Sequence, residues 1–107
     1  MNDFLERMRV LVAVGKVRIT EHGYDELAAD NIFARDAVEG IAAATIVEDY
    51  PAYPKGPCML LLQNDTNGDP IHVLWGIPKG FTEPAVLITA YRPDPDRWAD
   101  GFTMRRR

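Results

Sequence analysis

Three residues of this chain combine acid–base chemistry with an informative position: His22, His72 and Tyr91. His22 lies in the first turn of a predicted helix, where the helix dipole disfavours the imidazolium and leaves the ring available as a base or hydrogen-bond donor, although the neighbouring Glu21 acts in the opposite direction. His72 lies within a predicted strand, and Tyr91 ends another. For each residue a structural role is the alternative: a surface or capping histidine, a hydrogen-bonded histidine on a sheet face, and a tyrosine that seals the sheet edge.

Charge restricts what such a site could bind. The formal net charge is −4, and it is unevenly distributed. The first fifty residues hold ten acidic and five basic side chains, a balance of −5, whereas the segment from Arg92 onward holds five basic and three acidic ones, a balance of +2. Nucleic-acid binders normally show a basic surface. Any such site here is therefore local, and the run Arg105, Arg106 and Arg107 contributes to it. Arg92, beside Tyr91, offers a guanidinium fork for a phosphate.

Several classes of function find no support in the sequence. Two histidines and the single Cys58 show no recognised metal spacing, so no metal is predicted. The glycines are scattered and form no phosphate loop, so no cofactor is predicted. Glu48 and Asp49 are adjacent on a predicted strand and point to opposite faces, which excludes a catalytic carboxylate pair. Cys58 precedes an apolar run and is expected to be a buried, inert thiol. No apolar run approaches the ~20 residues that span a bilayer, so we expect a soluble cytoplasmic protein without membrane contact.

The elements that must position these residues follow from periodicity. Apolar spacing of 3.6 predicts helices early in the chain, and alternation predicts strands after residue 45. The predicted helices cover residues 3–14, about 20–30 with Thr20 as the cap, and roughly 35–43. The predicted strands cover residues 45–50, 58–63, 71–77 and 84–91, with a short strand or extended entry at 16–20. Residues 92–100 are expected to lie on the sheet as an irregular tail. This order indicates an α+β fold in which N-terminal helices pack on a curved antiparallel sheet of about four strands, in a single domain spanning residues 1–107.

Several short stretches, taken in order, carry a family resemblance. They are Ile19-Thr20-Glu21-His22, Asp36-Ala37-Val38, Val47-Glu48-Asp49-Tyr50-Pro51, Pro57 with Leu60-Leu61-Leu62, Pro70-Ile71-His72-Val73, and Thr89-Ala90-Tyr91-Arg92-Pro93-Asp94 with Trp98. Over about residues 16 to 107 this set resembles the DUF4258 family, whose fold is similar to that of RelE-like and BrnT-like toxins.

The resemblance implies a function and assigns roles. A RelE-like toxin implies RNA, free or on the ribosome, as substrate and an antitoxin protein as partner. By position, His22 or His72 would be the base, Tyr91 the proton donor, and Arg92 or Arg105 the phosphate clamp. The chain departs from the family pattern because acidic residues, Asp25 among them, occupy the helix after the first histidine, and because Cys58 stands where serine is commoner.

Two hypotheses follow. The first is a toxin-like ribonuclease that cleaves RNA by acid–base chemistry at His22, His72 and Tyr91, with Arg92 and Arg105 binding substrate. The second is a non-catalytic protein-binding module on the same fold, which the acidic balance favours. A small-molecule enzyme ranks third, because the sequence has no cofactor motif. A homodimer stays open under either hypothesis.

Overall fold

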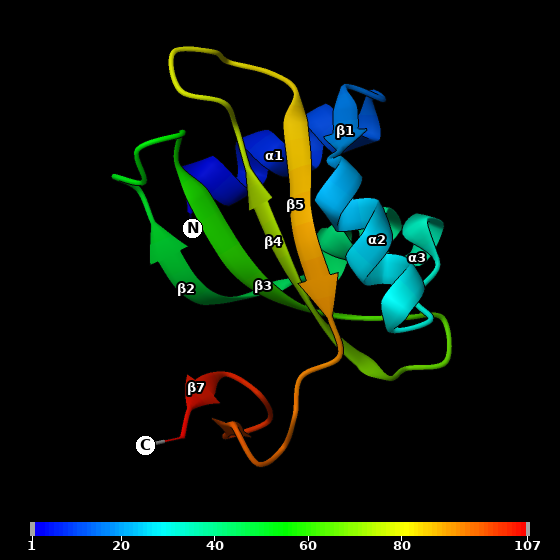
Figure 1. Ribbon diagram of the computed structural model, residues 1–107. Coiled ribbons are helices and arrows are strands. Elements are labelled where there is room, and N and C mark those ends of the chain that lie inside the picture. Colours follow the sequence, from blue (N-terminus) through cyan, green and yellow to red (C-terminus); the bar gives the residue numbers. More distant parts are fainter. Residues whose placement is uncertain (1, 107) are drawn as a thin grey trace.

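The computed structural model describes residues 2–106, and the three helices and one short strand precede the four longer strands of the main sheet along the chain (Figure 1). The elements in order are α1 (Asp3–Ala13), β1 (Val17–Ile19), α2 (Glu21–Ala29), α3 (Ala34–Glu39), a 3-10 turn η1 (Gly40–Ala43), β2 (Thr45–Tyr50), β3 (Cys58–Asn64), β4 (Pro70–Gly76), β5 (Ala85–Tyr91), β6 (Trp98–Ala99) and β7 (Met104–Arg105). The predicted α+β class is confirmed, and the four longer strands lie within a residue or so of their predicted positions.

The helix ends follow from side chains that cap them. The Asn2 side chain accepts from the backbone N–H of Leu5 at 3.1 Å, and the Thr20 hydroxyl accepts from the N–H of Gly23 at 2.8 Å, as predicted for Thr20. The third helix is shorter than expected, because α3 ends at Glu39 and the chain continues as η1. A Cβ at Gly40 would lie only 2.7 Å from the Gln63 side chain, so the close approach of this turn to β3 requires glycine.

The main sheet has five strands in the order β1-β5-β4-β3-β2 and is mixed. β2, β3, β4 and β5 pair antiparallel, whereas β1 runs parallel to β5 with Val17 opposite Ala85. The prediction of an antiparallel sheet of about four strands is therefore corrected to a mixed sheet of five. The physical reason is a long-range pairing: the Lys16 carbonyl accepts from Ala85, and Thr20 donates to the Leu87 carbonyl.

One face of this sheet is covered by the helices and forms the apolar core (Figure 1). Ile71, Val73 and Trp75, which alternate along β4, have no exposed surface, as their spacing predicted. Trp75 also needs a hydrogen-bond acceptor, and its indole N–H donates to the Gln63 amide oxygen at 2.9 Å. The Gln63 amide nitrogen in turn donates to the Ala37 carbonyl at 2.7 Å. This chain of hydrogen bonds links β4, β3 and α3 through the core.

The other face is crossed at one end by the C-terminal segment. This segment is not irregular as predicted, because β6 and β7 form a small antiparallel hairpin with Trp98 opposite Arg105. The Trp98 side chain of β6 is buried. Cys58, on β3, is buried as predicted, and burial raises the pKa of its thiol. Within residues 2–106 no helix has the length and apolar character needed to cross a membrane.

Candidate functional site

His72 and Tyr91 form a hydrogen-bonded pair on the face opposite the helices. They are directly opposite each other on β4 and β5, and His72 Nδ1 lies 3.1 Å from the Tyr91 hydroxyl. The other ring nitrogen, Nε2, lies 2.8 Å from the backbone carbonyl oxygen of Phe102. A carbonyl oxygen only accepts, so Nε2 carries the proton, and Nδ1 of the neutral ring accepts from the Tyr91 hydroxyl. The fold therefore fixes both the tautomer of His72 and the direction of the Tyr91 hydrogen bond.

Burial sets the protonation of this pair. The His72 side chain is 0% exposed, and this burial lowers its pKa below the ordinary value although the Phe102 carbonyl favours the charged ring. Burial also raises the pKa of Tyr91. At neutral pH the pair therefore consists of a neutral imidazole and a protonated phenol, which is the state that the hydrogen bonds require.

The C-terminal hairpin closes over His72. The Trp98 ring meets the imidazole edge-to-face, with centroids 4.5 Å apart. Asp100, Gly101 and Phe102 are three consecutive residues with positive φ, at 52°, 66° and 71°. Residues other than glycine rarely adopt this conformation, and the turn they form brings the Phe102 carbonyl onto His72. This contact leaves His72 without access to solvent.

An ion pair ties the hairpin to the far edge of the sheet. Arg105 on β7 makes two contacts with the Glu48 carboxylate on β2, at 2.7 and 3.0 Å, and the Tyr50 hydroxyl donates to the same carboxylate. The hydrogen bond from Arg105 lowers the pKa of Glu48, and the same contact raises the pKa of the Arg105 guanidinium. Arg105 also lies over the Trp98 ring, 4.8 Å from its centroid. The guanidinium is thereby held beside the His72–Tyr91 pair.

Tyr91 opens into a cationic pocket of about 320 Å³. Its lining residues are Tyr91, Arg92, Asp94, Arg97, Trp98 and Arg105. Arg92 is oriented from behind by two acids: its guanidinium lies 3.0 Å from Asp65, and its backbone N–H donates to Asp30 at 2.8 Å. Arg97 forms no ion pair with a carboxylate within the described residues. Arg92 and Arg105 are already paired with Asp65 and Glu48, so the arginine that is left to attract an anion by its charge is Arg97, and the other two offer guanidinium N–H donors in fixed positions.

The predicted site residues are only partly brought together. Tyr91, Arg92 and Arg105 line one pocket, and His72 lies behind Tyr91, hydrogen-bonded to its hydroxyl. His22 does not join them: it lies in the first turn of α2, its side chain is 66% exposed, and its charged neighbour is Glu26 at 3.9 Å. We predicted His22 and His72 in one site, and the fold places only His72 there.

Sequence reasoning missed three parts of the site: Arg97, Glu48 and the Phe102 carbonyl. Arg97 lies in the segment expected to be an irregular tail, and Glu48 was discounted as half of a carboxylate pair. Arg97 could have been found from the sequence, because residues 92–100 were predicted to lie on the sheet and Arg97 belongs to this segment. The Phe102 carbonyl has no sequence signature. Among residues 2–106, no group of three or more histidine, cysteine, aspartate or glutamate side chains is arranged to hold a metal ion.

Comparison with known proteins identifies the class. A family model described as "Domain of unknown function (DUF4258)" matches residues 19–92, which is more than half of the chain, and the protein belongs to this family. The matched range contains His72, Tyr91 and Arg92 and ends before the hairpin that covers His72. A search of curated proteins and a search of solved structures each found no match.

Proposed function

We propose that this DUF4258 protein is a toxin-type ribonuclease with a RelE-like arrangement, and that RNA is cleaved in the pocket at Tyr91. One observation carries the proposal. The Tyr91 hydroxyl is hydrogen-bonded to the buried His72 ring, and Tyr91 lines a pocket that three arginines also line. A proton-transferring group beside a phosphate-binding surface is what metal-independent cleavage of a phosphodiester needs.

The arginines bind the scissile phosphate. Arg92 and Arg105 are held in place by their carboxylate partners, so they lose little freedom when a phosphate arrives. Arg97 adds a guanidinium that is not already neutralised by a carboxylate of the described chain. This local cluster reconciles an anionic substrate with a chain of formal charge −4.

The chemistry is a transfer within the RNA strand. The ribose 2′-oxygen attacks phosphorus and the bond to the 5′-oxygen breaks, which leaves a 2′,3′-cyclic phosphate and a 5′-hydroxyl. Asp94, the carboxylate that lines the pocket, takes the 2′-hydroxyl proton, and Tyr91 donates its proton to the departing 5′-oxygen. Exchange with solvent water then returns both groups to their starting states.

His72 acts through Tyr91, because its buried ring does not reach the pocket. In the neutral pair the phenol proton points at Nδ1. A bound phosphate favours the imidazolium: the Tyr91 hydroxyl passes its proton to Nδ1 and takes one from water in the pocket, so that Nδ1 becomes a donor to the phenol oxygen and the new phenol proton points toward the substrate. His72 is thus a positioning residue in this mechanism.

The proposed likeness to RelE-type toxins is supported by the different roles of the two faces of the sheet. The helices occupy one face, and the polar cluster with its pocket lies on the other, as expected for an enzyme that binds RNA on a sheet. A toxin-type function brings with it an antitoxin partner, RNA or the ribosome as target, and a cytoplasmic location.

The test is direct. The purified chain is incubated with end-labelled single-stranded RNA, with and without ribosomes, and the new ends are analysed. We expect fragments with 2′,3′-cyclic phosphate and 5′-hydroxyl ends from the wild type. Tyr91→Phe should leave the RNA intact, while Tyr24→Phe, which changes an exposed tyrosine, should cleave normally. Intact RNA under both wild-type conditions would end the proposal.

The second candidate function is a non-catalytic protein-binding module. It is favoured by one observation: His72 is fully buried and both ring nitrogens are hydrogen-bonded, which also describes a structural histidine. The double variant His72→Gln/Tyr91→Phe separates the two candidates. A folded double variant that keeps the effect of the wild type in cells would identify the module.

A further inference from the structure

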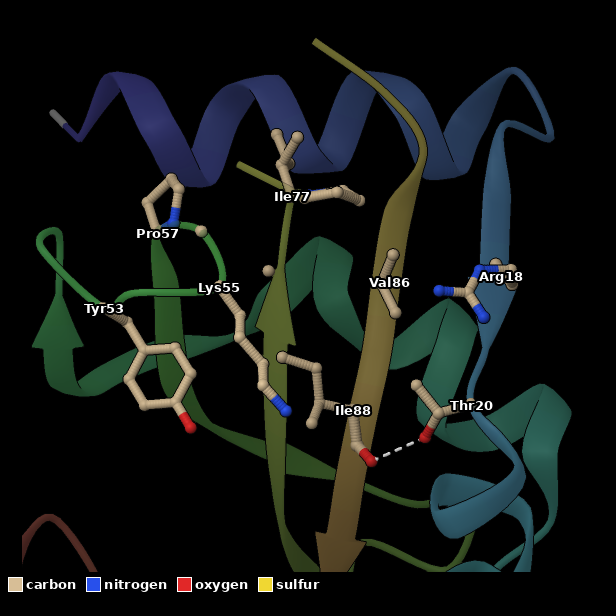
Figure 2. Close-up of a pocket in the computed structure, with 11 residues that line it drawn as sticks. Arg18, Thr20, Tyr53, Lys55, Pro57, Ile77, Val86 and Ile88 are labelled. Carbon is tan, nitrogen blue, oxygen red and sulfur yellow. Dashed lines mark hydrogen bonds between the residues drawn. The ribbon is translucent and has the colours of Figure 1, made fainter. Parts of the chain in front are cut away.

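A second hollow of about 320 Å³ lies on the same face of the sheet, and two cations border it (Figure 2). Its lining includes Arg18, Thr20, Tyr53, Lys55, Val86 and Ile88. β4 shows that the two sites share a face, because His72, Leu74 and Gly76 are two residues apart on one strand. His72 belongs to the first site, Leu74 to an intermediate hollow of about 270 Å³, and Gly76 to the second hollow. The His72–Tyr91 pair and the two hollows therefore lie along one face of the sheet.

Both cations stand on rigid backbone. Arg18 lies on β1, paired with Val86 of β5. The Lys55 carbonyl accepts from the Lys79 N–H at 2.9 Å. The next residue, Gly56, has a φ of 130° and packs so tightly that a Cβ there would lie 2.2 Å from the Ile77 carbonyl. The backbone that carries each cation is thus held before any ligand binds.

The two side chains are exposed and unused by the fold. Among the described residues neither Arg18 nor Lys55 forms an ion pair or donates a side-chain hydrogen bond to the protein. Figure 2 shows the Arg18 guanidinium and the Lys55 ammonium extending over the hollow from opposite sides. Paired positive charge of this kind, in a chain with an acidic excess, is complementary to an anion.

The rest of the hollow suits a flat apolar group. Val86 and Ile88 form an aliphatic floor, and the Tyr53 ring at the rim is 51% exposed. Aromatic and aliphatic surface next to a cation is the combination that proteins use to bind a nucleobase together with its phosphate. A free phosphate would use the cations but not the floor.

We propose that this hollow binds a nucleotide of the same single-stranded RNA, at a distance from the phosphodiester held at Tyr91. The identity of the ligand as RNA rests on the proposed function. Val86 and Tyr91 pair with Gly76 and His72, which are four residues apart on β4, because β5 has a bulge between them; this corresponds to about 13 Å along the strand, a span of a few nucleotides. Arg18 and Lys55 bind the phosphate, and the base lies on the floor against Tyr53.

The experiment measures binding separately from cleavage. Fluorescence anisotropy with a labelled oligouridylate is recorded on the Tyr91→Phe background, so that the RNA stays intact. Adding Arg18→Gln and Lys55→Gln should weaken binding about tenfold and reduce the slope of log affinity against log salt by roughly 0.7, since each single-strand phosphate that the protein neutralises contributes about 0.7. The matched control is Arg7→Gln/Arg35→Gln, which removes the same charge from exposed positions on α1 and α3.

The outcomes separate this inference from the proposed function. A loss in the Arg18/Lys55 variant with less than about a twofold change in the control supports the hollow. An equal change in both variants, or none in either, overturns it, even if the wild type cleaves RNA. If the wild type does not cleave but binding depends on Arg18 and Lys55, the nuclease proposal fails and the RNA-binding hollow stands.

Aromatic stacking has its own test. Tyr53→Leu should weaken oligouridylate binding severalfold, whereas Tyr53→Phe, which keeps the ring, should not. Inorganic phosphate provides the comparison, because it lacks a base: its competition should be unaffected by Tyr53→Leu. Wild-type oligouridylate affinity in Tyr53→Leu would overturn the nucleotide assignment.

Discussion

The two faces of the five-stranded sheet are closed by different kinds of contact. On one face the helices supply apolar side chains, and Met8 of α1 and Leu27 of α2 belong to the same buried cluster as Leu61 and Trp75 of the sheet. On the other face a hairpin closes one end through polar contacts: the bond from His72 to a backbone carbonyl and the ion pair between Arg105 and Glu48.

This difference separates stability from function. Apolar burial is insensitive to protonation and to salt, so the helix-covered face holds the fold under all ordinary conditions. Polar closure depends on the charge state of a few groups, so the hairpin side responds to pH, to salt and to bound anions. The same side carries both candidate RNA-contact regions.

The largest effect is expected on the helix-covered face. Leu61→Ala removes a side chain with no exposed surface from the core and should lower the free energy of unfolding by about 2–5 kcal/mol. Leu74→Ala, on the open face, removes the same atoms from a half-buried position and should cost about 1 kcal/mol. Urea unfolding of both variants measures the difference. Equal losses would show that the two faces do not differ in the way described.

The two histidines provide the next comparison, on activity. If RNA is cleaved at Tyr91, His72→Gln should reduce the rate on the order of 10²-fold, because the phenol loses a partner that can donate to it. His22→Gln should change the rate less than about twofold, since His22 lies outside the site. The cleavage rate is also measured over a range of pH. The pH profile should change in His72→Gln and stay as in the wild type in His22→Gln. A comparable loss in both variants would place His22 in the mechanism.

Local signals in the sequence predicted much of this fold. Thr20 was predicted as a cap from its residue type alone, and the alternation of Ile71, Val73 and Trp75 predicted the buried face of β4. Pairing between distant segments was not predictable in this way. Residues 16–20 were predicted as a short strand or extended entry, but their partner β5 lies far along the chain, so the parallel pairing that makes them the fifth strand was not predicted.

The candidate site was predicted in part for the same reason. His72, Tyr91, Arg92 and Arg105 were proposed from residue type, and register brings the first two together because they face each other across β4 and β5. The second hydrogen-bond partner of His72 is the main-chain oxygen of residue 102, which a residue of any type would provide. Its position depends on a turn of left-handed residues, and only the folded hairpin reveals it.

The pH dependence of stability tests the polar closure. Since burial lowers the pKa of His72 in the folded state, the unfolded chain binds its proton more readily, and stability is lost as pH falls below the ordinary value of 6.5. Glu48, whose folded pKa is also lowered, contributes its loss only in more acidic solution, below 4.5. Urea unfolding at about pH 7.5 and about pH 5.5 therefore isolates the histidine. His72→Gln, which does not titrate, should lose less stability across this interval than the wild type.

The smallest effect is expected from the ion pair that fastens the hairpin. The Arg105 side chain is 62% exposed, so water and salt screen its attraction to Glu48, and a double-mutant cycle with Arg105→Gln and Glu48→Gln should give a coupling of about 0.5 kcal/mol. The coupling should diminish in high salt, whereas the cost of Leu61→Ala should not. A coupling above about 2 kcal/mol that persists in high salt would mean that the hairpin is closed as firmly as the helix-covered face. The measurement therefore decides whether the C-terminal hairpin is a fixed wall of the Tyr91 pocket or a polar cover that solution conditions loosen.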